Sequence, residues 1–132
     1  MLFLPQSVLD DWLLEDVNMG DLTTRTLGLS ATPGQMTFCS RTEVCVSGIE
    51  AATALMARLG LKIVASLNEG DLAAKGEVLL QVTGPVARLQ QGWKVGQNIL
   101  EWACGVATHT QNMVSIARAI NPRVSIACTR KS

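Results

Sequence analysis

The sequence predicts an α+β fold, with short mixed strands and packed helices, that leads into the first strand of a βα architecture. Up to Pro85 the chain consists of short runs separated by turns that contain Gly, Asn and Pro, a pattern typical of short strands and helices. From Val86 to Ile120 apolar residues recur at intervals of three and four, which predicts helix. The small and β-branched residues of 123–129 predict a strand buried on both faces, as a parallel strand following a helix would be.

The first sixty residues contain two helix signals and two strand signals. Ser7 is a suitable N-cap, Thr32-Pro33-Gly34 predicts a turn, and Gly60 provides a stop signal for a helix. The expected elements are, in order, a helix from Ser7 to Asp16, two strands within 35–46 and a helix from Ile49 to Leu59.

The middle of the chain alternates between strands and turns. We expect strands over 61–67 and 78–82, with turns at 68–71 and 75–76 between them and Gly84-Pro85 at the end. The helical pattern that follows ends at Asn121-Pro122.

Composition excludes several classes of protein. Apolar residues make up 48% and charged residues 17% of the 132 residues, which excludes a disordered chain and an ion-rich coiled coil. The formal charge of zero lacks the field of a nucleic-acid or anionic-membrane binder, so we expect neither partner. The longest uncharged stretch, 103–117, is too polar to span a membrane and no signal-peptide pattern opens the chain, so we expect a cytoplasmic protein. Four cysteines without a CxxC spacing, and one histidine, predict neither a metal cluster nor a disulfide framework.

Candidate binding residues lie at two places. Ligands of parallel sheets lie at the carboxyl ends of the strands, where Arg130 and Lys131 follow the last predicted strand. A bidentate guanidinium beside an ammonium suits a carboxylate and a phosphate, although two solvated charges are the alternative. Lys94, Asn98 and Glu101 form a polar stripe on the long helical segment, which is either a solvated face or a contact surface. Glycines at 92 and 96 are costly in a helix unless the backbone approaches something closely.

Three ordered motifs resemble the start of the nicotinate-nucleotide pyrophosphorylase family, also called quinolinate phosphoribosyltransferase. They are Glu15-Asp16…Gly20-Asp21-Leu22-Thr23, then Asn98-Ile99-Leu100…Cys104-Gly105-Val106-Ala107-Thr108, then Thr129-Arg130-Lys131-Ser132. The order of the motifs along the whole chain makes this resemblance far more specific than any one motif.

The resemblance implies a fold and an activity. It implies an α+β N-terminal domain with connecting helices over residues 1–110 and the start of an incomplete α/β barrel over 111–132. It also implies a homodimer with shared active sites that transfers a phosphoribosyl group from phosphoribosyl pyrophosphate to a pyridine carboxylate such as quinolinate. Arg130 and Lys131 then correspond to cations that bind substrate, and Lys94 to an arginine that reaches into the partner's site. Mg²⁺ is implied at the pyrophosphate, with no ligands expected in this chain.

The sequence departs from the family pattern at five positions. It has Lys for Arg at 94, Trp93 for an acidic residue, Cys104 for Ser, Cys128 for Asp and Ser132 for Thr. The run from Gly92 to Trp102 is more similar to the ModD branch, which is encoded with molybdenum-transport genes. A lysine cannot reproduce the arginine fork, so the acceptor could differ from quinolinate.

A binding module is the alternative to an enzyme. The segment 69–79 resembles the turn and strand pattern of biotinyl and lipoyl carrier domains, in which a lysine, here Lys75, is modified at a tight hairpin. For the enzyme, we expect the 132-residue chain alone to be inactive, because one barrel strand supplies only part of the phosphate site.

Overall fold

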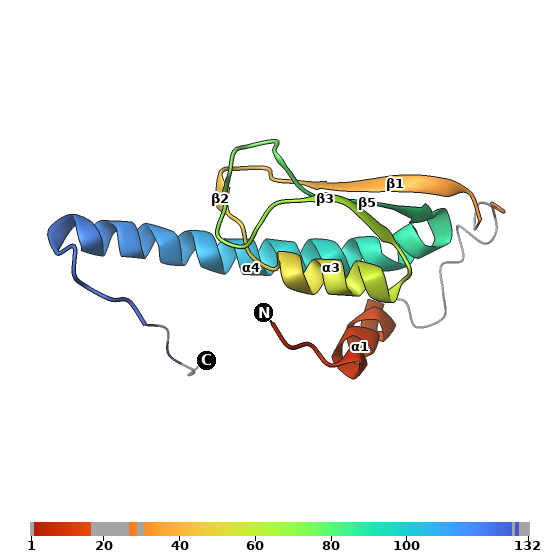
Figure 1. Cartoon of the computed structure of the whole chain (residues 1–132), viewed down its shortest axis with the longest axis horizontal. Coiled ribbons are helices and arrows are strands. Elements are labelled where there is room, and N and C mark those ends of the chain that lie inside the picture. Colours follow the sequence, from red (N-terminus) through yellow and green to blue (C-terminus); the bar gives the residue numbers. More distant parts are fainter. Residues whose placement is uncertain (1, 17–26, 29–30, 128, 130–132) are drawn as a thin grey trace.

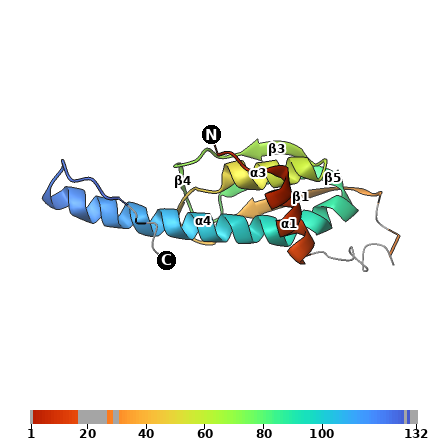
Figure 2. The same ribbon diagram turned by 90° about the horizontal axis from the view of Figure 1, so that it is seen from below.

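The computed structural model describes residues 2–16, 27–28, 31–127 and 129, and arranges them in three layers (Figure 1). A small sheet lies on one side, α3 and α4 pack side by side beneath it, and α1 crosses the outer face of these helices (Figure 2). This mixture of small sheets and helices confirms the predicted α+β class. In chain order the elements are α1 (Gln6–Asp16), β1 (Pro33–Cys39), β2 (Val44–Cys45), α3 (Ile49–Arg58), β3 (Lys62–Ser66), β4 (Leu72–Ala73), β5 (Val78–Pro85) and α4 (Val86–Ile120).

The main sheet is antiparallel with the order β1-β5-β3, and β2 pairs with β4 in a separate two-stranded sheet. A turn was expected at 32–34, but β1 begins at Pro33, so Pro33 and Gly34 lie in the strand. A proline is tolerated there because it is the first residue of an edge strand, paired with Pro85. Nearer the N-terminus, α1 begins at Gln6, one residue before the predicted N-cap. Ser7 therefore lies within the helix.

Helix α3 ends as its sequence predicts. Gly60 has a φ of 73° and its N–H donates to the Ala57 carbonyl at 2.9 Å. The next N–H, from Leu61, donates to the Met56 carbonyl at 3.0 Å. These two bonds form a Schellman motif, and its apolar partners Met56 and Leu61 are both buried in the core.

The start of α3 is held by a distant carboxylate. Glu69, in the predicted turn between β3 and β4, accepts the N–H groups of Gly48 and Glu50, each at 3.0 Å. A carboxylate at a helix N-terminus satisfies unpaired N–H groups and favours the helix dipole. The sequence gives no signal for this cap because Glu69 lies 19 residues beyond Glu50, whose N–H it accepts.

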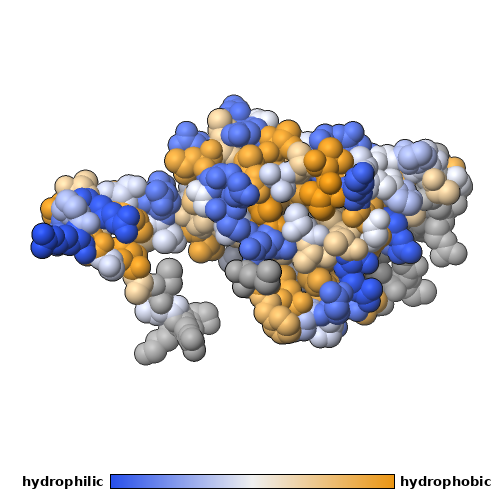
Figure 3. Space-filling model, viewed as in Figure 1, coloured by the Kyte–Doolittle hydropathy of each residue, from blue (hydrophilic) through white to orange (hydrophobic). Residues whose placement is uncertain are grey.

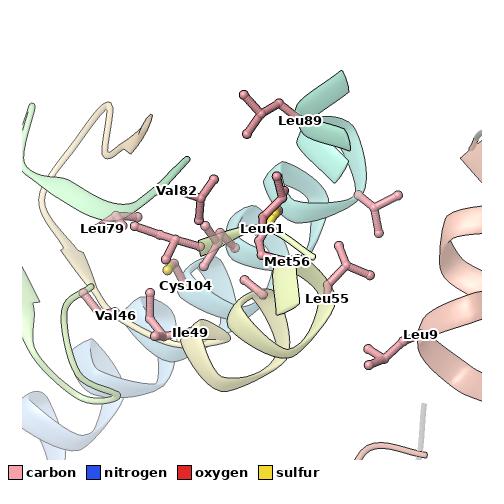
Figure 4. Close-up of a cluster of buried hydrophobic side chains, with 14 of the residues drawn as sticks. Leu9, Val46, Ile49, Leu55, Met56, Leu61, Leu79, Val82, Leu89 and Cys104 are labelled. Carbon is pink, nitrogen blue, oxygen red and sulfur yellow. The ribbon is translucent and has the colours of Figure 1, made fainter. Parts of the chain in front are cut away.

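One apolar core connects the three layers (Figure 4). Leu55 and Met56 of α3 and Leu80 and Val82 of the central strand β5 are completely buried. The core also includes Leu9, Val46, Ile49, Ala52, Leu61, Ala73, Leu79, Leu89, Val95, Leu100 and Cys104. Leu9 extends the core into α1, and the ion pair between Arg58 and Asp10, at 2.8 Å, ties α1 to α3 at the surface.

Helix α4 is one continuous helix of 35 residues, and it passes through the boundary expected at 110 and 111. Its first half packs under the sheet and its second half projects from the domain (Figure 1). The strand predicted over 123–129 has no ladder in the described residues 123–127 and 129. A strand needs a neighbouring strand to bond with, and the described strands belong to the two antiparallel sheets. No described helix combines the length and apolar character that a membrane span requires.

Candidate functional site

Lys94 lies near the beginning of α4, beside Trp93. The side chain is half-buried, and its Nζ lies 5.4 Å from the centroid of the Trp93 ring, within the range of a cation–π interaction. Asn98 and Glu101, one and two turns further along, are exposed. The predicted stripe therefore presents a cation, an amide and a carboxylate outward from the domain.

Arg130 and Lys131 lie outside the described residues, as does the Gly20-Asp21-Leu22-Thr23 motif. The structure therefore places one of the three predicted site residues, Lys94. Their relationship to one another stays a prediction.

The two glycines near Lys94 serve close packing. A Cβ on Gly92 would lie 2.7 Å from Leu59 Cδ1, and a Cβ on Gly96 would lie 2.6 Å from Met56 Cε and 3.0 Å from Phe38 Cζ. The distances of 2.7 and 2.6 Å are shorter than carbon atoms tolerate, and 3.0 Å is a tight contact. The backbone approach that the sequence suggested is therefore an approach to α3 and β1, and it fixes the face on which Lys94 emerges.

The motif from Cys104 to Thr108 anchors the small sheet to α4. Thr108 Oγ1 accepts the N–H of Cys45 at 2.9 Å and donates to the Cys104 carbonyl at 2.6 Å. Cys104 Sγ donates to the Ser47 carbonyl at 3.3 Å and lies 3.4 Å from the Ser47 nitrogen. Burial raises the pKa of the Cys104 thiol, which keeps its proton available for this bond. The short Cys104 side chain therefore acts as both donor and acceptor toward the Ser47 backbone.

Two clefts flank the outer side of α4, and the sequence predicts neither. The larger, about 1080 Å³, lies between α1 and α4 and has a mostly apolar lining that includes Trp12, Trp102 and Val106. The smaller, about 530 Å³, lies between α4 and the β1–β2 segment. Its polar lining includes Thr37, Ser40, Arg41 and Thr42 on one wall and Gln97 and Glu101 on the other. Both clefts join elements that are distant in the sequence, so spacing gives no signal for them.

The described residues contain no group of three or more His, Cys, Asp or Glu side chains placed to hold a metal ion. Binding chemistry around Lys94 consists of a cation, an aromatic ring and hydrogen-bonding side chains.

The fold is shared with solved pyrophosphorylases. NadC from Streptococcus pyogenes matches with a TM-score of 0.83 at 18% identity, over 98% of this chain and 48% of that chain. The nicotinate-nucleotide pyrophosphorylase from Francisella tularensis matches with a TM-score of 0.78 at 17% identity, over 89% of this chain and 43% of that chain. The architecture is that of the N-terminal portion of such proteins.

Residues 21–104 match the family model described as the quinolinate phosphoribosyl transferase N-terminal domain, and the chain belongs to this family. ModD of Pasteurella multocida (strain Pm70) is 44% identical over 100% of this chain and 47% of that protein. A nicotinate-nucleotide pyrophosphorylase from Methanothermobacter thermautotrophicus is 29% identical over 95% of this chain and 45% of that protein. These matches confirm the resemblance to the family and to ModD. The chain spans about half the length of the curated relatives it matches.

Proposed function

We propose that this chain is the N-terminal portion of a phosphoribosyltransferase that moves a phosphoribosyl group from phosphoribosyl pyrophosphate to a small carboxylate acceptor and releases pyrophosphate. The observation that carries the proposal is the family match over 21–104, within a fold that presents Lys94 outward. The acceptor is a pyridine carboxylate such as quinolinate, or a related molecule that serves a molybdenum-transport context, as the identity to ModD suggests. We also propose a cytoplasmic location.

Phosphoribosyl transfer requires that the donor and the acceptor are positioned and that cations stabilise the departing pyrophosphate. As the C1 bond of the donor breaks, negative charge develops on the departing pyrophosphate, and fixed cations lower the energy of that state. In this proposal Arg130 and Lys131 hold the donor and the carboxylate, and Lys94 adds a point charge at the acceptor. Mg²⁺ would shield the pyrophosphate, with no ligands expected from this chain.

The length of α4 favours a site shared between two subunits. Lys94 and Ile120 are 26 positions apart on one helix, which is about 39 Å along its axis. Arg130 lies ten positions beyond Ile120, and ten fully extended residues reach at most about 36 Å. A turn in which Val124 N–H donates to the Asn121 carbonyl at 3.1 Å shortens that reach. Within one chain, Lys94 and Arg130 can meet only if residues 121–130 run back along α4 in an extended form, a condition that a homodimer does not impose.

Subunit complementation tests this proposal. In a full-length form, Lys94→Ala and Arg130→Ala homodimers should each release little pyrophosphate from phosphoribosyl pyrophosphate and acceptor. A mixed dimer carries one site that lacks both cations and one intact site, so about half of the native activity should return per heterodimer. The 132-residue chain alone is the inactive control.

Activity that stays at the homodimer level despite demonstrated subunit exchange would show that Lys94 acts within its own chain. The acceptor is tested separately by calorimetry with quinolinate. If Lys94 contacts a carboxylate, Lys94→Arg should strengthen quinolinate binding by about 1–2 kcal/mol, because the guanidinium offers a bidentate contact.

The alternative function, a biotinyl or lipoyl carrier, is tested by measuring the mass of the purified chain. Lys75 is exposed in a tight turn in which Glu77 N–H donates to the Ala74 carbonyl at 3.0 Å, so the geometry does not separate a carrier from an enzyme. The family match favours the enzyme. Mass spectrometry of the purified chain should show no biotinyl or lipoyl adduct, and an adduct at Lys75 would support the carrier instead.

A further inference from the structure

We propose, on the basis of the proposed function, that the cleft between β1 and α4 selects an aromatic acceptor that carries one carboxylate and one N–H donor group, in preference to a dicarboxylate. Trp93 lines the cleft, and Lys94 Nζ lies 5.4 Å from the centroid of its ring, which places a cation near one end of the cleft. Its volume of about 530 Å³ suits a small molecule.

One wall of the cleft is a row of side chains on α4. Trp93, Gln97 and Glu101 follow one another at intervals of four, so they lie side by side along the helix, about 6 Å apart in rise from one to the next. The row begins with an aromatic ring and ends with a carboxylate. Apolar side chains, including Phe38 and Leu100, line the cleft between the two walls.

The first end of the row favours an anionic aromatic ligand. Trp93 is 45% exposed, so it is available to a ligand. Lys94 Nζ lies over its ring, 5.4 Å from the centroid, and supplies a cation at this end of the row. A lysine supplies one point charge here, which suits one carboxylate.

The far end of the row favours a donor. Gln97 Nε2 donates to Glu101 Oε1 at 2.8 Å, which holds the carboxylate in place and leaves its second oxygen and the Gln97 carbonyl as acceptors. A second carboxylate on the ligand would meet the like charge of Glu101, whereas an amine or amide would donate to it. Arg41 also lines the cleft, on the wall opposite α4.

A pair of matched ligands tests the inference without phosphoribosyl pyrophosphate. 4-(Aminomethyl)benzoate and terephthalate share a ring and one carboxylate and differ only in the para group. Binding of each to the full-length form and to the 132-residue chain is measured by calorimetry, with tryptophan fluorescence as a second readout. The amine should bind about tenfold more tightly, as expected for a hydrogen bond to a charged group.

Glu101→Gln should reduce that preference to about twofold or less, since the charge is lost and the shape is kept. Asp11→Asn removes the same charge from an exposed position on α1 and should leave the preference unchanged. Trp93→Leu should weaken both ligands together, because they share the ring.

A preference that survives Glu101→Gln, or no measurable binding of either ligand, would overturn the inference. Neither result bears on the proposed function, which depends on pyrophosphate release and subunit complementation. Conversely, a ligand preference without any pyrophosphate release would support the inference about the cleft and contradict the proposed transferase activity.

Discussion

The two halves of α4 share a sequence pattern and have opposite surroundings. Leu89, Val95, Leu100 and Cys104, in the first half, are buried against the sheet and α3. Val106, Met113, Ile116 and Ile120, in the second half, are 48% to 86% exposed. Figure 3 shows apolar side chains at the surface of the projecting end. Apolar periodicity therefore indicates which face of a helix can be buried. The elements packed against the helix determine how far along its length that face is buried.

The largest difference between the halves should appear on truncation of apolar side chains. Leu100→Ala removes a side chain that is 3% exposed and should cost about 2–5 kcal/mol of unfolding free energy through lost burial and a cavity. Ile116→Ala, at 68% exposure, should change it by less than about 0.5 kcal/mol. Urea unfolding of both variants measures the two values. Equal losses would mean that the second half of α4 is packed in solution.

The hydroxyl that ties β2 to α4 lies just beyond the packed half. Thr108→Val keeps the shape of the side chain and leaves the Cys45 N–H without its 2.9 Å partner. We expect a loss of about 1–3 kcal/mol, as for an unpaired buried donor. Thr110→Val, two positions further into the projecting half, is the matched control and should change stability by less than about 0.5 kcal/mol. The comparison is read from thermal or urea unfolding of the two valine variants.

Replacing each of two glycines of α4 with alanine should change the free energy of unfolding in opposite directions. Gly96→Ala places a Cβ 2.6 Å from Met56 Cε and 3.0 Å from Phe38 Cζ, so overpacking of about 1–3 kcal/mol outweighs a helix-propensity gain of about 1 kcal/mol. Gly105→Ala meets open space and should stabilise the helix by up to about 1 kcal/mol. Urea unfolding followed by circular dichroism measures the change in unfolding free energy of each variant. Stabilisation by both substitutions would contradict the close packing of α4 on α3.

The smallest effect concerns the surface pair that ties α1 to α3. The hydrogen bond from Arg58 lowers the pKa of the Asp10 carboxyl in the folded state. Its stabilisation is therefore present above the ordinary carboxyl pKa of about 3.9 and is lost as the pH falls through the lowered folded value. The stability difference between the native chain and Asp10→Asn should be small at pH 7 and should vanish in acid. Arg58→Gln should remove the same pH dependence, and its persistence in that variant would assign it to another group.

Local signals predicted most of the fold. Gly60 ends α3 because its Schellman bonds involve only neighbouring residues, and the strand and turn pattern of 61–82 needed no distant partner. The two-residue strand β4 gave no signal, since its pairing to β2 depends on residues about thirty positions away. The start of β1 at Pro33 was also missed, because only the three-dimensional structure shows that this strand is an edge.

The candidate site was predicted less completely. Lys94 could be singled out from its motif, and the structure places it outward. The clefts could not be predicted, because Arg41 and Glu101 come to face one cleft only after β1 and α4 pack. The glycines at 92 and 96 gave a correct signal for close approach but not for what is approached, which is a helix and a strand.

The unbroken length of α4 also has a mechanical consequence. Between Thr108, which is hydrogen-bonded to Cys45, and Ile120, which is 86% exposed, the helix extends about 18 Å as a lever arm. A tilt of about 5° at Thr108 would swing Ile120 through about 1.6 Å, given the helical rise per residue. Small adjustments where Gly92 and Gly96 seat α4 against α3 are therefore amplified at the far end of the helix, where the chain continues toward Arg130.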